Sequence, residues 1–315
     1  MTLPSSVAAP TETTKLEDRY WDWNGYKIRY QAAGETQSDA PSLVLIHGFG
    51  GNADHWRKNT PVLANAGFRV FAIDLIGYGY SDKPDPKSMS ASGYNFYTWA
   101  DQVRAFIDEV VKDKSFLICN SIGSCVGLQA AVDYPEKVEG VMILDPSLRL
   151  LNIKRQNPLS APLVTAFQAL LRETPVGEAF FGVVATENTV RNVLRQAYHD
   201  SSTVTDELVQ VILNPGKTPN APRVFLDFIS YSAGPLPEEL LCALSSDEFK
   251  VPVSILWGTK DPWEPVEQGR IFQAGRFACV EEFVELPGTG HCPQDEAPQL
   301  VNPRVIDFVT RHWKQ

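Results

Sequence analysis

A serine in the segment Phe116–Gly123 has the surroundings that a nucleophile requires. An apolar run typical of a buried strand leads directly into Asn120 and Ser121, and a helix-compatible run begins at Ile122. Such a strand-to-helix turn presents the serine hydroxyl above the edge of a sheet. Cys119 stands where the usual Gly-x-Ser-x-Gly pattern has its first glycine. We predict that Ser121 is a nucleophile; the alternative is an ordinary turn that contains a serine.

A serine nucleophile needs a base, and the chain contains five histidines. His291 follows a short apolar run at Phe283–Leu286 and a Pro-Gly-Thr-Gly loop. A loop that follows a parallel strand lies at the carboxyl edge of the sheet, where ligands bind in open α/β sheets. We predict that His291 is the base, with a structural loop histidine as the alternative. The other histidines lie in a glycine-rich loop, in predicted helices or in an insertion: His47, His55, His199 and His312.

The acid that orients the base should lie between Ser121 and His291 if the chain order is Ser, Asp, His. Two aspartates, Asp145 and Asp261, each end a predicted strand in that interval. We prefer Asp261, because its Gly-x-x-Asp-Pro loop can deliver the carboxylate from the strand next to the histidine. Asp145 remains the alternative acid. If it is not the acid, its role is structural: it caps a helix or lines the floor of the pocket. Glu264 is a further reserve, three residues beyond the strand end.

The reaction also needs hydrogen-bond donors for the negative oxygen that develops on the substrate. The amide of Ile122, directly after the nucleophile, is one predicted donor. The glycine-rich loop His47–Gly51 follows an earlier strand, and its glycines allow the amide of Phe49 or Gly50 to turn inward. Phe49 and Ile122 therefore form the predicted oxyanion hole. A phosphate-binding loop is a weak alternative, because the glycine spacing is neither GxGxxG nor Walker-type.

Strands and helices alternate around these residues. Asn24-Gly25, which suits a type I′ turn, connects two short strands at 20–23 and 26–30. The strands that follow are apolar without alternation, which indicates a mostly parallel sheet covered on both faces. Further strands are predicted at 43–47, 68–75, 115–120, 138–145, 253–257 and 283–286, and helices at 55–66, 97–112, from 122 onward, 163–171, 190–199, 204–213, 225–231 and 300–313.

The alternation breaks near Pro146, and residues 148–249 are predicted to form a helical cap of short helices separated by prolines. The core is then formed by residues 20–147 and 250–315, preceded by a flexible leader at 1–19. Aromatic side chains of such an insertion more often form the interior of a lid than contact a substrate. A lid over the sheet edge nevertheless lines the pocket with some of them, which favours a hydrophobic substrate. These aromatic residues are Phe167, Phe180, Phe181, Phe225, Phe228 and Tyr231.

Composition and charge exclude several classes of protein. A formal net charge of −10 without a basic stripe argues against a nucleic-acid partner. No window approaches the roughly 18 consecutive apolar residues of a spanning helix, so no integral membrane segment is expected. Five cysteines without paired spacing favour a soluble protein in a reducing compartment. No Cys/His cluster indicates zinc, so neither a metal nor a cofactor is predicted, and the oligomeric state is left open.

Five motifs in this order along the chain resemble the α/β-hydrolase superfamily. The resemblance extends from about Tyr20 to the C-terminus, except for the insertion. It implies an α/β fold with a mostly parallel eight-stranded sheet flanked by helices and a cap inserted after strand 6. It also implies a serine hydrolase that cleaves a carboxylic ester, with a hydrophobic small molecule as its partner. The motifs are His-Gly-Phe-Gly-Gly at 47–51, Asp-Leu-x-Gly-x-Gly-x-Ser-Asp-Lys-Pro at 74–84, Asn-Ser-x-Gly-Ser at 120–124, Trp-Gly-x-x-Asp at 257–261 and Gly-x-Gly-His at 288–291.

Three further segments, Asn24–Gln31, Asp54–Asn59 and Asp261–Pro265, are similar to plant and algal plastid hydrolases of the pheophytinase and chlorophyll dephytylase branch. Enzymes of that branch cleave the phytyl ester of chlorophyll-type pigments. This narrower resemblance implies a pigment ester as the substrate and a chloroplast as the location.

Other activities of the superfamily fit these residues less well. Haloalkane dehalogenases and epoxide hydrolases carry an aspartate nucleophile where this chain has Ser121. Carbon–carbon bond hydrolases carry Asn-Ser-x-Gly but have a tryptophan after the histidine, where this chain has Cys292; they remain the enzymatic runner-up. Cofactor-free haloperoxidase chemistry would use the same three residues. A ligand-binding receptor of this fold with little turnover is the non-enzymatic alternative.

Overall fold

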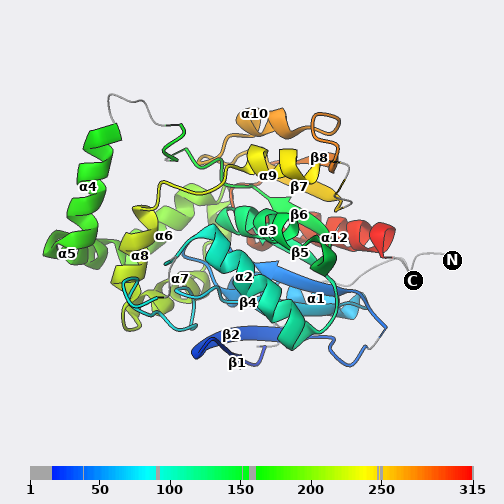
Figure 1. Cartoon of the computed structure of the whole chain (residues 1–315), viewed down its shortest axis with the longest axis horizontal. Coiled ribbons are helices and arrows are strands. Elements are labelled where there is room, and N and C mark those ends of the chain that lie inside the picture. Colours follow the sequence, from blue (N-terminus) through cyan, green and yellow to red (C-terminus); the bar gives the residue numbers. More distant parts are fainter. Residues whose placement is uncertain are drawn as a thin grey trace.

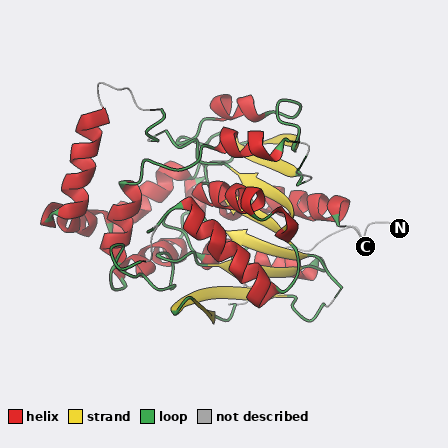
Figure 2. Cartoon of the chain, in the orientation of Figure 1, coloured by secondary structure: helices red, strands yellow, loops and turns green. Residues whose placement is uncertain are grey.

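In the computed structural model, which describes residues 16–37, 39–89, 93–150, 152–155, 161–246, 248 and 251–313, an eight-stranded sheet runs through the centre of the chain (Figures 1 and 2). Its strand order is β1-β2-β4-β3-β5-β6-β7-β8; β2 pairs antiparallel with both β1 and β4, and the other pairs are parallel. The prediction of a mostly parallel eight-stranded sheet is therefore confirmed. The strands are β1 Arg19–Trp23, β2 Tyr26–Ala33, β3 Ser42–Ile46, β4 Arg69–Ile73, β5 Ser115–Asn120, β6 Val138–Leu144, β7 Val253–Gly258 and β8 Val280–Leu286.

Helices cover both faces of the sheet, and β3 shows how its side chains are divided between them. Val44 and Ile46 pack with α2 and α3 in one apolar cluster, whereas Leu43 and Leu45 pack with α1 and α12 in a second one. All of β3 is buried, which explains the absence of polar alternation in its sequence. The helices of these layers and of the sheet ends are α1 Thr60–Asn65, α2 Phe96–Phe106, α3 Ile122–Asp133, α9 Pro237–Leu244, α10 Val266–Gly269, α11 Pro293–Glu296 and α12 Pro298–His312.

The N-terminal hairpin is present, with Asn24 and Gly25 both at positive φ, 54° and 82°, as a type I′ turn requires. β1 begins at Arg19, one residue inside the predicted leader, and the carboxylate of Asp18 binds the guanidinium of Arg29. The leader prediction otherwise concerns residues 1–15, which lie outside the described residues.

Two predicted helices are interrupted. The helix expected at 55–66 is a 3₁₀ turn, Ala53–Trp56, followed by α1, because Pro61 lacks an N–H and its ring would clash with the carbonyl of residue 57. The helix expected at 97–112 is α2 followed by one π-helical turn, Ile107–Val111, which ends at Lys112 with a φ of 62°. Short 3₁₀ turns also occur at Pro135–Lys137, Ser201–Thr203, Asn214–Lys217 and Arg270–Phe272.

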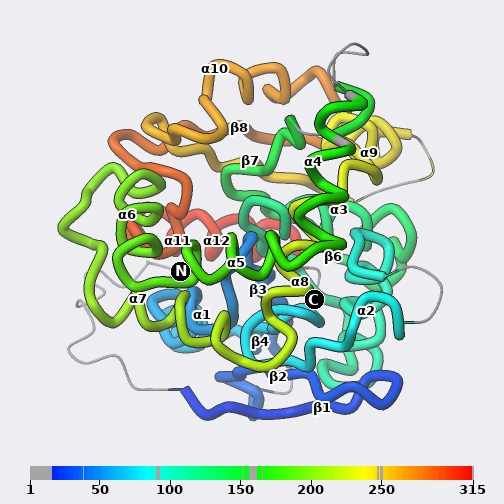
Figure 3. Tube along the Cα trace, turned by 90° about the vertical axis from the view of Figure 1, so that its left-hand side faces the viewer, coloured from blue at the N-terminus to red at the C-terminus, as the bar shows by residue number. Residues whose placement is uncertain are grey.

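The helical insertion after β6 lies over one end of the sheet; in Figure 3, its helices α5 to α8 lie in front of the strands. One of them, α5, has no counterpart in the sequence analysis, because Gly177 and Gly182 lower its helix propensity. Its start is nevertheless signalled by Thr174, whose side chain accepts a hydrogen bond from Val176, and by Pro175. The helices are α4 Ala161–Glu173, α5 Pro175–Val184, α6 Glu187–Ala197, α7 Asp206–Leu213 and α8 Ala221–Ile229.

Helix α9 falls inside the predicted cap range of 148–249 but packs against α3 of the sheet layer. Its Leu240, Leu241 and Leu244 are buried in the same cluster as the strands. The chain therefore returns to the sheet layer before residue 249. Within the described residues, no helix combines the length and the apolarity that crossing a membrane requires.

Candidate active site

Ser121 occupies the turn between β5 and α3 in a backbone conformation that few side chains adopt. Its φ of 55° and ψ of −120° lie outside the regions that L-residues favour. Its amide donates a hydrogen bond to the carbonyl oxygen of Leu144 at the end of β6 (3.0 Å). Its own carbonyl oxygen accepts from the amides of Ser124 (3.0 Å) and Ser147 (3.2 Å). These bonds to α3 and to the segment after β6 hold the strained turn in place.

Close backbone packing around the turn requires glycine at two positions. A Cβ atom on Gly48 would lie 3.0 Å from the Cβ of Ser121, and one on Gly123 would lie 2.5 Å from the carbonyl oxygen of His47. The glycine-rich loop after β3 and the first turn of α3 can therefore approach each other only without side chains at these positions. This brings the Gly48-Phe49 backbone next to the serine.

His291 and Asp261 meet Ser121 in a continuous hydrogen-bonded chain. The Ser121 hydroxyl lies 2.9 Å from Nε2 of His291, and Nδ1 of His291 lies 2.6 Å from Oδ2 of Asp261. All three side chains are buried. The second oxygen of Asp261 accepts the amides of Trp263 (2.8 Å) and Glu264 (3.0 Å), so its loop fixes the carboxylate. The structure thus brings together the three residues that the sequence analysis selected.

Asn120, the residue before the serine, connects the segments of the site. Its side-chain amide donates to the carbonyl oxygens of Leu144 (3.2 Å) and His291 (3.1 Å), and its oxygen accepts from Gln294 (3.2 Å). The backbone amide of His291 is in turn bonded to the carbonyl oxygen of Ala197 at the end of α6 (2.8 Å). The histidine loop is therefore held both by the sheet and by the cap.

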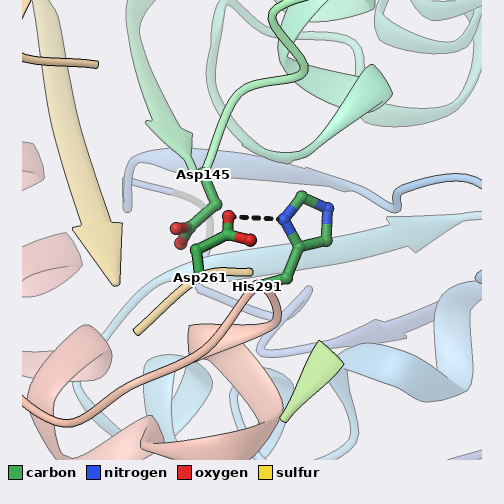
Figure 4. Close-up of side chains that lie close together, drawn as sticks. All are labelled: Asp145, Asp261 and His291. Atoms are coloured by element: carbon green, nitrogen blue, oxygen red, sulfur yellow. Dashed lines mark hydrogen bonds and ion pairs between the residues drawn. The ribbon is translucent and has the colours of Figure 1, made fainter. Parts of the chain in front are cut away.

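Asp145, the alternative acid, lies on the far side of Asp261 from the histidine ring (Figure 4). Its Oδ1 accepts a hydrogen bond from the amide of Gly258 at the end of β7 (2.8 Å). The side chain is fully buried, and burial together with the nearby negative charge of Asp261 raises the pKa of Asp145 well above its usual range. No hydrogen bond joins Asp145 to His291 among the described residues, and its bond to Gly258 links the ends of two strands.

One group of acidic and histidine side chains in the described residues is close enough together to hold a metal ion. Its possible ligand atoms lie within 4.8 Å of one another and belong to Asp145, Asp261 and His291. The atoms of His291 and Asp261 that face each other already form a hydrogen bond. The cluster is accounted for as an acid–base arrangement, and nothing in its donor set requires a metal.

The two predicted oxyanion donors differ in how their amides are left unpaired. Ile122 is the first residue of α3, so its N–H has no acceptor within the helix. Phe49 lies in the loop after β3, and no hydrogen bond from the amide of either residue is found within the described part of the chain.

The Phe49 ring adds a contact that the sequence did not predict: it stacks on Phe228 of α8, with 5.4 Å between ring centroids, and lies 5.3 Å from Phe225.

A cavity of about 640 Å³ lies against Ser121 and His291, between the sheet edge and the cap. Its lining is mostly apolar, and four of the six cap aromatics named in the sequence analysis contribute to it: Phe181, Phe225, Phe228 and Tyr231. Phe167 and Phe180 are instead exposed, at 59% and 41%. The cavity is large enough for a small organic molecule.

The lining includes the lysine, arginine and carboxyl side chains of Lys83, Arg149 and Glu264, which were not predicted to line it. Glu264, named before only as a reserve acid, accepts a hydrogen bond from the amide of Leu148 (3.1 Å), and its other oxygen is buried without a partner among the described residues. Burial raises the pKa of Glu264 to about 7. The sequence signal for Arg149 and Glu264 is their position just beyond the ends of β6 and β7.

Cys119 replaces the first glycine of the usual Gly-x-Ser-x-Gly motif, and Gly127 of α3 leaves space for its side chain. Its side chain is fully buried, and a Cβ atom added to Gly127, two turns along α3, would lie 2.4 Å from its Sγ. Ser124, in the first turn of α3, donates its hydroxyl hydrogen to the carbonyl oxygen of Cys119 (3.3 Å). The volume that Cys119 adds to β5 is thus matched by the volume that Gly127 omits from α3.

The fold and the composition of the site define a hydrolase. A model of the alpha/beta hydrolase fold family matches residues 41–298, so the chain belongs to this family. It is 27% identical to "Pheophytinase, chloroplastic" of Arabidopsis thaliana over 95% of its own length, but it spans 66% of that relative. It is 25% identical to the 2-hydroxy-6-oxononadienedioate/2-hydroxy-6-oxononatrienedioate hydrolase of Paraburkholderia phymatum, over 87% of this chain and 89% of the relative.

Solved structures agree on the fold. The epoxide hydrolase CorEH superimposes with a TM-score of 0.73 and 23% sequence identity, covering 94% of this chain and 99% of its own. At that identity the likeness concerns the architecture alone.

The pairing of Cys119 with Gly127 predicts a specific energetic coupling. Gly127→Ala should lower the free energy of unfolding by about 1–3 kcal/mol, because the new methyl group overpacks the space that the sulfur occupies. In a Cys119→Gly background the same substitution should cost much less. Urea denaturation of the two single variants and the double variant measures the coupling.

Gly182→Ala is the matched control for this pair, because nothing lies within 4 Å of a Cβ atom at that helical position. It should leave stability unchanged or raise it by up to about 1 kcal/mol. An equal cost of Gly127→Ala with and without the Cys119 sulfur would contradict the packing argument.

The raised pKa of Glu264 predicts a pH-dependent stability. The folded protein keeps the Glu264 proton up to pH about 7, whereas the unfolded chain releases it near 4.5. The folded state therefore binds the extra proton within this window, and stability falls as pH rises through it. The free energy of unfolding of the wild type, minus that of Glu264→Gln, should fall by about 2 kcal/mol between pH 5 and pH 8.

The control is Glu267→Gln, which makes the same chemical change at an exposed position three residues further on. Its difference from the wild type should stay flat over the same pH range. A flat difference for Glu264→Gln as well would show that this carboxyl group is not desolvated in solution.

Proposed function

We propose that this protein is a serine hydrolase that cleaves a carboxylic ester of a largely apolar molecule. The observation that supports the proposal most strongly is the hydrogen-bonded chain from Ser121 through His291 to Asp261, at 2.9 and 2.6 Å. A buried serine within reach of an imidazole that is itself oriented by a carboxylate is the arrangement of acyl-transfer enzymes. Ser121 is the nucleophile, His291 the base and Asp261 the acid in this proposal.

The reaction proceeds in two acyl-transfer steps. His291 removes the hydroxyl proton of Ser121 as the oxygen attacks the ester carbonyl, and the oxyanion receives hydrogen bonds from the amides of Ile122 and Phe49. The intermediate expels the alcohol, which takes the proton from His291, and leaves an acyl group on Ser121. Water then attacks the acyl-enzyme with His291 again as the base. Asp261 holds the imidazole in the tautomer that this sequence of proton transfers requires.

Asp145 takes no part in the proton transfers of this mechanism. Its bond to the Gly258 amide and its raised pKa make it a neutral structural group behind Asp261. Helices α4 to α8 act as the cap over the substrate, and the sheet with its flanking helices acts as the catalytic core.

The substrate is assigned more finely by similarity. One relative that matches 95% of this chain is named a chloroplastic pheophytinase, and the cavity is mostly apolar. We therefore propose the phytyl ester of a chlorophyll-type pigment as the first substrate to test, with a chloroplast as the corresponding location.

A carbon–carbon bond hydrolase is the second candidate. The similarity to the dienedioate hydrolase, which covers most of both chains, favours it. Cys292, however, follows the histidine here, and its side chain is buried against α6 and α7 rather than being a large aromatic group. Substrate preference distinguishes the two activities, because only the ester hydrolase releases an alcohol.

Variants of the three central residues test the proposed roles. Ser121→Ala should abolish turnover of p-nitrophenyl esters and labelling by a fluorophosphonate probe, because no other hydroxyl of the described residues is hydrogen-bonded to Nε2 of His291. Asp261→Asn should lower kcat by about 10³- to 10⁴-fold, because the imidazole loses the partner that fixes its tautomer. Steady-state kinetics and gel-based labelling measure both effects.

Asp145→Asn is the matched control, since it removes a buried carboxyl group of the same type from the other strand end. It should cost less than about tenfold in kcat, because an amide can still accept the Gly258 hydrogen bond. Circular dichroism establishes that each variant is folded. Residual esterase activity of Ser121→Ala would overturn the nucleophile assignment, and a larger loss in Asp145→Asn would move the acid to β6. A ligand-binding receptor with little turnover would show slow or absent probe labelling of the wild type.

Incubation with pheophytin a, chlorophyll a and simple p-nitrophenyl esters tests the substrate assignment. We expect release of phytol from a pigment, detected by chromatography, together with turnover of medium-chain p-nitrophenyl esters. Ser121→Ala serves as the blank. Cleavage of the simple esters without release of phytol would remove the pigment assignment while leaving the ester hydrolase in place.

A further inference from the structure

The cavity beside Ser121 has a charge opposite to that of the chain. The whole sequence carries a formal charge of −10. Among the cavity-lining residues in the described part of the chain, however, Lys83 and Arg149 are cations and Glu264 alone is acidic. Burial raises the pKa of Glu264 to about 7 and lowers the pKa of Lys83 to about 8. Two of these three side chains that line the cavity are therefore cationic groups, and Arg149 is the more basic of these two.

Arg149 is the unusual member of this set, because its guanidinium is buried with few partners. The residue is 8% exposed, and no carboxylate of the described residues lies within ion-pairing distance of it. A guanidinium offers five N–H groups, yet within the described residues this one makes a single hydrogen bond, from Nη2 to the carbonyl oxygen of Ala233. Nε is buried without any partner in the described residues. Burying a charge in this way is costly unless a ligand completes its hydrogen bonds.

The surroundings of Arg149 orient the guanidinium without neutralising it. Its Cζ lies 4.4 Å from the ring centroid of Phe96 and 5.4 Å from that of Tyr231. Aromatic faces hold the cation in place by cation–π attraction but leave its N–H edges unbonded. The backbone at Arg149 has a φ of 57°, in the left-handed region that non-glycine residues seldom occupy. Such strain is concentrated at sites that bind ligands.

The segment that carries Arg149 is fixed by bonds that do not involve its side chain. The amide of Ile153 donates to the carbonyl oxygen of Ser232 (2.8 Å), and the side chain of Asn152 donates to that of Gly234 (3.2 Å). Among the described residues, the bond from the guanidinium to Ala233 is therefore one of three that join this segment to residues 232–234 after α8, and the other two do not depend on the Arg149 side chain. Ser147, two residues earlier, donates its amide to the carbonyl oxygen of Ser121 (3.2 Å), so the segment begins at the nucleophile itself.

We infer that Arg149 is the binding site for a carboxylate group on the substrate, so that the natural substrate is an ester with an apolar body and a free carboxylate away from the scissile bond. The flat fork of a guanidinium matches the two oxygens of a carboxylate. The remaining cavity lining, which is mostly apolar, takes the hydrocarbon part. The inference rests on the proposed function only for the statement that the substrate is an ester. It favours an ester other than those of chlorophyll a and pheophytin a, because the carboxyl groups of these pigments are esterified and leave no free carboxylate for Arg149.

Binding of octanoate and octanamide tests this site without requiring turnover. The two molecules share one hydrocarbon chain, and only octanoate is an anion at pH 7.5. Isothermal titration of the full chain should give at least about tenfold tighter binding of octanoate than of octanamide. In Arg149→Met, which keeps the unbranched stem and removes the charge, this preference should fall to less than about threefold. The affinity for octanamide reports whether the cavity itself is intact.

Arg155→Met is the matched control, because Arg155 belongs to the same chain segment but pairs with Glu238 and does not line the cavity. It should keep the full preference for octanoate. If Arg149 had only a structural role, Arg149→Met would weaken octanoate and octanamide equally, and that result would overturn the inference. Equal binding of the two molecules by the wild type would overturn it as well.

Turnover of neutral p-nitrophenyl octanoate separates this inference from the proposed function. Hydrolysis of that ester without any preference for octanoate would remove the carboxylate site and leave the ester hydrolase standing. If the wild type preferred octanoate, Arg149→Met lost that preference and no ester was hydrolysed, the carboxylate site would be supported and the ester hydrolase proposal would be wrong.

Discussion

The geometry of the site depends on the strained backbone of Ser121. A φ of 55° and a ψ of −120° lift the hydroxyl out of the turn between β5 and α3 and leave the amide of Ile122 at the N-terminal end of the helix. Strain of this kind costs about 1–3 kcal/mol and persists only where the surroundings fix it. Hydrogen bonds to Leu144, Ser124 and Ser147 do so here, because they tie the turn to the next strand and to its own helix. Catalytic geometry is thus stabilised by the buried sheet and not by the loop alone.

The cap has two different relations to this centre. Its α6 end contributes the Ala197 carbonyl that binds the amide of His291, and residues of α6 and α7 form a small apolar cluster with Cys292. This part of the cap is bonded to the loop that carries His291, so a movement of α6 would displace that side chain. The outer helices α4 and α5 carry exposed apolar side chains such as Leu163, at 75%, and Val183, at 66%. Among the described residues, no backbone hydrogen bond joins α4 or α5 to the loop of His291, so a movement of these outer helices would leave the bonds of that loop intact.

The sequence predicted most of the fold and the central residues of the site, and the reasons are local. Each central residue stands at the end of an apolar strand, and strand ends in a parallel sheet meet at one edge, so Ser121, Asp261 and His291 could be associated without knowing the tertiary structure. Packing between distant segments left no such signal. The stacking of Phe49 on the cap and the placement of α9 on α3 depend on contacts between segments far apart in the chain. The burial of Arg149 without an anion depends on the whole cavity, which neither spacing nor composition reveals.

The two aspartates behind the histidine differ in their hydrogen-bond partners. Two carboxylates in a buried site repel each other, and burial disfavours both charges. Asp261 accepts hydrogen bonds from two backbone amides as well as from the histidine. Asp145 receives one amide and no cation among the described residues, and the pKa of its carboxyl group is raised. A neutral Asp145 joins the ends of β6 and β7 without adding a second negative charge. In the proposed mechanism a single carboxylate therefore faces the imidazole, and the imidazolium formed during acyl transfer is balanced by that one charge.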